Sequence, residues 1–122
     1  MLKALGCGLA AVLATLLMGI WHRAVVTLGP LDAFPLGLVL GLLGVFGWAV
    51  AARALAGGAG AFAAAVGAFV ASQAAALPGP GGDLLIQGDV TGFAWAIAAP
   101  VAAMAASFLP RSWFRRLSRG DR

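Results

Sequence analysis

The chain has 122 residues and a formal net charge of +4; 62% of its residues are hydrophobic and only 10% are charged. A soluble domain has about 25% charged residues, and so few charges could not cover its surface. Composition therefore excludes an ordinary soluble domain and indicates a single domain whose main partner is the lipid bilayer.

Four apolar runs come close to the roughly 20 residues that a helix needs to cross a bilayer. They predict membrane-spanning helices at about 5–22, 36–53, 59–76 and 93–110, followed by a basic tail at 111–122. The expected fold is all-α: an integral membrane four-helix bundle made of two helical hairpins, with a tight turn at Gly57-Gly58 joining the hairpins.

The first run could instead be a cleaved secretory signal, since Lys3 precedes it. However, Trp21, His22 and Arg23 occupy the place where a cleavage site requires small residues. We therefore expect a retained helix.

Basic residues predict the orientation, because they are enriched in cytoplasmic connections. In a four-helix topology, seven of the eight basic residues fall on one side and only Arg23 on the other. The seven are Lys3, Arg53, Arg111, Arg115, Arg116, Arg119 and Arg122. We expect a multi-pass protein of a bacterial plasma membrane with both termini in the cytoplasm, and Trp21 and Trp95 near the outer interface.

Small residues recur every three or four positions, which favours close helix packing in a bilayer. The stripes expected to face neighbouring helices are Gly37, Gly41, Gly44 and Trp48; Gly60, Ala64, Ala68 and Ser72; Gly67, Ala71 and Ala75; and Ala94, Ala98, Ala102 and Ala106. Pro100 predicts a kink in the last helix. Ser72 and Gln73 are expected to make an intramembrane polar contact.

No catalytic group, cofactor site or metal site is expected. His22 is the single histidine and Cys7 the single cysteine, so neither can build a metal site from its own residue type. The predicted spans hold no acidic residue of the kind that coupled transporters use. The sequence therefore favours a protein that is not an enzyme.

The remaining candidate site residues lie in the two connections expected on the outer side of the membrane. Asp83 and Asp89, with His22 and Arg23, form a possible extracytoplasmic contact surface. The loop at 77–92 could equally be a connection only, because Gly-Asp pairs suit turns and Asp89 is placed to cap the last helix.

The basic tail is expected to contact anionic lipid, since each basic residue near the membrane surface contributes about 1 kcal/mol. The residues concerned are Arg111, Arg115, Arg116 and Arg119. Protein docking is the alternative for this tail, and nucleic acid is not an expected partner.

The segments "GGDLLIQGD" and "GFAWA", the "WHR" after the first helix and the arginine-rich tail resemble a group of small four-helix membrane proteins from high-GC actinobacteria. The resemblance implies an architecture and a bacterial host but no activity. We expect an accessory or scaffold subunit that packs against another membrane protein. The alternatives are a homo-oligomeric transporter or channel lined by Ser72, Gln73 and Pro100 and, more distantly, a lipid-acting enzyme using His22, Asp83 and Asp89.

Overall fold

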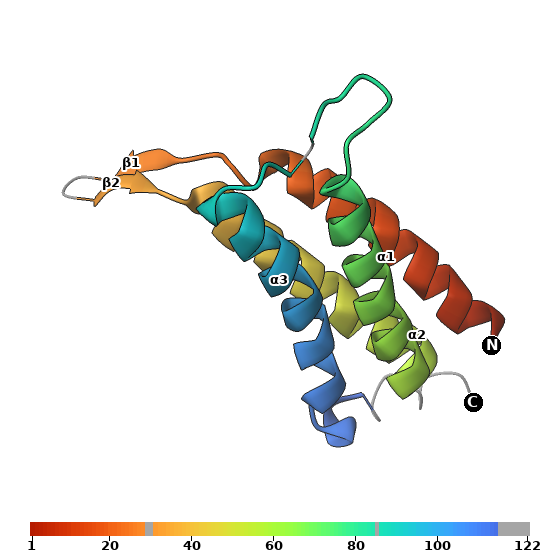
Figure 1. The fold of residues 1–122 in the computed structure, drawn as a ribbon. Coiled ribbons are helices and arrows are strands. Elements are labelled where there is room, and N and C mark those ends of the chain that lie inside the picture. Colours follow the sequence, from red (N-terminus) through yellow and green to blue (C-terminus); the bar gives the residue numbers. More distant parts are fainter. Residues whose placement is uncertain (29–30, 85, 115–122) are drawn as a thin grey trace.

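The computed structural model describes residues 1–28, 31–84 and 86–114 (Figure 1). In chain order the elements are helix α1 (Leu2–Trp21), strands β1 (Val26–Leu28) and β2 (Leu31–Phe34), helix α2 (Leu36–Ala75), helix α3 (Val90–Ala105) and the short 3-10 helices η1 (Ala106–Phe108) and η2 (Arg111–Trp113). The described part of the chain is therefore mostly helical.

Among the described residues, three helices are long and apolar enough to cross a membrane: α1, α2, and α3 with its continuation η1. The prediction of a membrane protein with transmembrane helices is confirmed at this level. The expected helices at 36–53 and 59–76 do not appear as separate elements, because both lie within the 40 residues of α2.

Helix α2 is interrupted at Ala56 and Gly57, whose backbone angles are not helical. Gly57 has φ 64° and ψ −150°, a conformation open almost only to glycine. The ribbon changes direction at this point (Figure 1). A Cβ on Gly60 would overlap the carbonyl oxygen of Ala52, so the chain approaches itself closely across the break. We call residues 36–55 the first segment of α2 and residues 58–75 its second segment.

Helix α1 packs against both segments of α2. Trp48 Nε1 in the first segment donates a hydrogen bond to the carbonyl oxygen of Cys7, 3.3 Å away. In the second segment, a Cβ on Gly67 would overlap the carbonyl oxygen of Gly8. Glycine at position 67 therefore allows the backbones to approach closely, as membrane helix pairs require.

The core consists mainly of alanine. The stripe Gly60, Ala64, Ala68 and Ser72 is buried as expected, and so are Gly67 and Ala71. In the first segment of α2 the buried face contains Gly37, Gly41, Val45 and Ala49, whereas Gly44 and Trp48 are only half-buried.

The stripe predicted for the last helix was wrong at three of its four alanines, whereas Ala106 is buried as expected. The buried residues of α3 are Gly92, Trp95, Ala99 and Ala103, whereas Ala94, Ala98 and Ala102 are only half-buried. Trp95 is the physical reason, because its large side chain is 1% exposed and sets which face of the helix points inward. Trp95 is therefore enclosed by the bundle and does not form part of its outer surface.

The two ends of the bundle differ. Met1, the break in α2 and η2 lie at one end, which we call the N-terminal end (Figure 1). At the other, the loop end, lie the β-strands and the loop at 76–89 (Figure 1). The strands pair antiparallel, with Val26 opposite Phe34. They were not predicted from the sequence, although Val26 and Thr27 have the β-branched side chains that strands favour.

Candidate functional site

Trp95 occupies the centre of the bundle near its loop end, between α1 and the first segment of α2. A Cβ on Gly41 would lie 2.7 Å from Trp95 Cζ3, and one on Gly19 would lie 3.3 Å from Trp95 Nε1. Two glycines on different helices thus leave the space that the indole fills. The spacing of glycines in the sequence predicts Gly41 as a packing residue but does not predict the indole that it accommodates.

His22 follows the last turn of α1 and is 1% exposed. Its ring centroid lies 5.7 Å from that of Trp95, and its Nδ1 contacts the carbonyl oxygen of Gly19. Its Nε2 and the Thr15 hydroxyl are buried with no hydrogen-bond partner among the described residues. The imidazole of His22 is therefore not accessible from outside the bundle, and a binding partner at the surface would contact the residues around it instead.

Arg23 and Asp89 form an ion pair at the loop end, with Arg23 Nη2 2.6 Å from Asp89 Oδ2. Asp89 also caps α3, because its Oδ1 accepts a hydrogen bond from Gly92 N–H at 2.8 Å. The hydrogen bond from Arg23, and secondly that from Gly92, lowers the pKa of Asp89 below its ordinary value of 3.8. Asp89 thus holds the start of α3 to the end of α1.

Asp83 is exposed in the loop, where its carbonyl oxygen accepts a hydrogen bond from Gly79 N–H at 2.8 Å. Within the described residues, no three His, Cys, Asp or Glu side chains lie close enough together to hold a metal ion. The loop is anchored to the bundle by Ile86, which is 4% exposed and whose N–H donates to the carbonyl oxygen of Ala75 at 3.0 Å. The loop is therefore fixed to the bundle through Ile86, and the exposed Arg23–Asp89 ion pair lies at its end.

The hydroxyl of Ser72 contacts α3 at the carbonyl oxygen of Ala96, one helical turn before Pro100. In a regular helix the N–H of residue 100 would bond to the carbonyl oxygen of Ala96, but proline has no N–H. Ser72 Oγ lies 3.3 Å from that oxygen and 3.0 Å from the carbonyl oxygen of Phe69. The single hydroxyl proton of Ser72 can therefore satisfy the acceptor that Pro100 leaves open.

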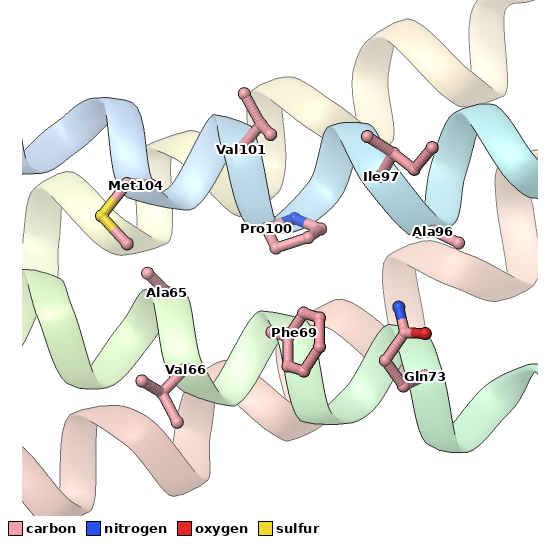
Figure 2. A pocket seen from close by; sticks show the side chains of 9 residues that line it. All are labelled: Ala65, Val66, Phe69, Gln73, Ala96, Ile97, Pro100, Val101 and Met104. Carbon is pink, nitrogen blue, oxygen red and sulfur yellow. The ribbon is translucent and has the colours of Figure 1, made fainter.

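A groove of about 500 Å³ opens on the outer surface of this interface (Figure 2). It is lined by Ala65, Val66, Phe69, Gln73, Ala96, Ile97, Pro100, Val101 and Met104. The amide of Gln73 is the one polar side chain in the lining, at the end of the groove nearest to Ala96 (Figure 2). We call this feature the lateral groove.

A second hollow of about 340 Å³ adjoins the lateral groove toward the loop end. Gln73, Ala96 and Ile97 line both, and Gln87 adds a second amide. Neither lining contains an acid or a base, so the combined surface can hold apolar groups and make amide hydrogen bonds, but it offers no group for proton transfer.

At the N-terminal end, Arg53 connects α2 to η1, the continuation of α3, and to the residue that follows η1. Its Nη1 donates to the carbonyl oxygen of Ser107 and its Nη2 to that of Leu109, both at 2.7 Å. Arg111 is exposed nearby in η2. The expected lipid contacts Arg115, Arg116 and Arg119 lie outside the described residues.

The roles of Trp95 and Arg53 were not predicted from the sequence. A tryptophan inside an alanine-rich run is a signal for a packing site, since so large a side chain needs glycines opposite it. No local signal pairs Arg53 with carbonyl groups more than 50 residues away along the chain.

Comparison with protein-family models, curated proteins and solved structures found no match to this chain.

Proposed function

We propose that this chain is a non-enzymatic accessory subunit of a bacterial plasma membrane, and that it binds a transmembrane helix of a larger complex in the lateral groove. The shape and the lining of the lateral groove are the observation that supports this proposal. It opens sideways, it is apolar along its length, and it presents one amide, that of Gln73. A side-chain amide in hydrocarbon gains from a hydrogen-bonding partner on a neighbouring helix.

The dimensions of the groove suit a helix as the occupant. Its lining runs from Ala65 to Gln73 on α2 and from Ala96 to Met104 on α3. Each stretch covers about 12 Å of helix axis, or roughly two turns. Side chains such as Ala65 and Ala96 leave room between the two helices for the ridge of a third.

The proposed arrangement in the membrane has four crossings, one by each segment of α2. The break at Ala56 and Gly57 and the change of direction there support it. Both termini would then lie on one side, and the basic residues favour the cytoplasm for that side. The lateral groove would open at membrane depth.

Photo-crosslinking in native membranes tests the docking proposal. A photoreactive amino acid replaces Val101 in the groove or, as a control, Leu43 on the first segment of α2; these side chains are 61% and 59% exposed. We expect a discrete protein adduct from position 101 and none from position 43. Equal adducts from both positions, or none from either, would contradict the proposal.

A homo-oligomeric transporter or channel is the second candidate, because Gln73 lies where the two hollows meet. In this function the groove would receive a second copy, and position 101 would give an adduct of twice the chain's mass. Reconstituted liposomes should then show a solute flux that Gln73→Leu reduces. A folded, uniformly oriented sample without flux would rule this candidate out.

A further inference from the structure

A small cavity at the N-terminal end is separate from the lateral groove. It has a volume of about 170 Å³ and is lined by Arg53, Gly57, Gly58, Arg111 and Phe114. Two arginines therefore line one small space, and no carboxylate of the described residues lines it. The cavity carries a concentrated positive charge.

Arg53 is held firmly at this cavity, because it is only 8% exposed. Both terminal nitrogens donate to backbone carbonyls, and its Cζ lies 5.4 Å from the centroid of the Phe114 ring. The carbonyls stand at the end of α3 and η1, where a helix presents about half a negative charge. This partial negative charge balances only part of the positive charge of one guanidinium. Burying a charge without a full counter-charge costs free energy.

Among the described residues, the guanidinium of Arg53 also has donors that no acceptor uses. An arginine carries five N–H donors in a planar fork, and the two carbonyl contacts use two of them. Arg111 adds a second fork from η2. Forked guanidinium groups match the oxygens of a phosphate group better than they match any neutral ligand.

The break in α2 contributes backbone to the same cavity. Apart from their own chain neighbours, no atom of the described residues lies within 4 Å of a Cβ placed on Gly57 or Gly58, so the space beside these two glycines is open. The second segment of α2 begins here, and the first N–H groups of a helical segment have no partner within it. Their positive polarity adds to that of the two arginines.

We propose that this cavity binds a phosphate group, held between Arg53 and Arg111 above the Gly57-Gly58 backbone. The group can belong to the headgroup of an anionic lipid or to free phosphate, since the recognising chemistry is the same. The site is independent of the lateral groove and of what the groove binds.

Native mass spectrometry of the full-length protein in detergent tests the site. The probes are dioleoylphosphatidylglycerol and inorganic phosphate, with dioleoylphosphatidylcholine as a lipid of no net charge. We expect one phosphatidylglycerol bound tightly per chain and phosphatidylcholine bound more weakly. Displacement of this lipid by excess inorganic phosphate would identify free phosphate as a competent ligand, and retention of the lipid would identify the headgroup as the required form.

Two charge-removing variants separate a defined site from general attraction. Arg111→Gln removes an exposed arginine of the cavity, and Lys3→Gln removes one charge at the same end but outside the cavity. We expect Arg111→Gln to weaken binding by roughly tenfold or more and Lys3→Gln by less than about twofold. Equal weakening by the two variants, or no binding of either probe to the parent protein, would overturn the proposal.

Discussion

At the scale of single residues, a serine on one helix compensates for a proline on another. Pro100 leaves the carbonyl oxygen of Ala96 without its helical donor, and Ser72 Oγ lies 3.3 Å from it. At membrane depth no water is present to donate a hydrogen bond to such a backbone carbonyl. Ser72 is therefore part of what makes a proline tolerable inside α3.

A double-mutant cycle measures this compensation. We expect Ser72→Ala to lower the free energy of unfolding by about 1 kcal/mol, the usual size of an interhelical hydrogen bond in a membrane. In a Pro100→Ala background, residue 100 again donates to Ala96, so the same serine substitution should cost clearly less. Steric-trapping measurements of unfolding in bicelles would give the four values. An equal cost in both backgrounds would show that Ser72 bonds only within its own helix.

At the scale of elements, the sequence predicted where helices form more reliably than which faces they bury. Apolar runs of sufficient length required helices, and the spacing of Gly60, Ala64 and Ala68 indicated the buried face of the second segment of α2 correctly. In α3, alanine occupies both candidate faces, so spacing alone could not choose between them. Trp95 decides the orientation through its fit against Gly19 and Gly41, which are distant in sequence.

The break in α2 depends on one glycine of a pair. Gly57 has φ 64° and Gly58 has no positive φ, and both would have free space around an added Cβ. We expect Gly57→Ala to destabilise the protein by about 1–3 kcal/mol, because the conformation of residue 57 is strained for any other residue. Gly58→Ala should be neutral or slightly stabilising. Thermal unfolding in detergent compares the two variants, and equal midpoints would contradict the role given to Gly57.

The start of α3 should respond to pH through Asp89. The pKa of this carboxyl is lowered in the folded protein, chiefly by its hydrogen bond from Arg23. Its contribution to stability is therefore fully present above the ordinary value of 3.8 and is lost as the pH falls through the lower, folded value. Unfolding from neutral pH to below 3.8 should show this loss in the parent protein.

Asp89→Asn provides the matched control for that pH dependence. An asparagine can still accept the hydrogen bond from Gly92 as a helix cap, but it does not titrate and carries no charge for Arg23. We expect this variant to be less stable than the parent at neutral pH and to lose less on acidification. Identical pH profiles for the two proteins would show that the ion pair contributes nothing to folding.

At the scale of the whole molecule, the contacts that sequence reasoning missed join distant parts of the chain. His22 is buried because Trp95 lies against it, and Arg53 reaches Ser107 and Leu109 at the end of the last helix. Neither partner is near in sequence, so neither contact has a local pattern. By contrast, the apolar runs and the polar or turn-forming residues between them were enough to predict that the bundle has two different ends, the N-terminal end and the loop end.

Helix α2 determines how many times the whole molecule crosses the membrane. A straight helix of its 40 residues would be about 60 Å long, twice the roughly 30 Å of hydrocarbon in a bilayer. The interruption at Ala56 and Gly57 and the contact of Gly60 with Ala52 shorten it. Two crossings by α2 would place both chain termini on one side, whereas one crossing would place them on opposite sides.

Cysteine labelling in oriented membrane vesicles distinguishes these arrangements. Cys7 is the only cysteine and is buried, so Cys7→Ala gives a background for single introduced cysteines. We expect Lys3→Cys and Ser112→Cys to react with a membrane-impermeant maleimide from the same side, and Gly81→Cys from the opposite side. All three positions are exposed in the structure. Reaction of positions 3 and 112 from opposite sides would contradict four crossings, because an odd number of spans would then separate the two ends of the chain.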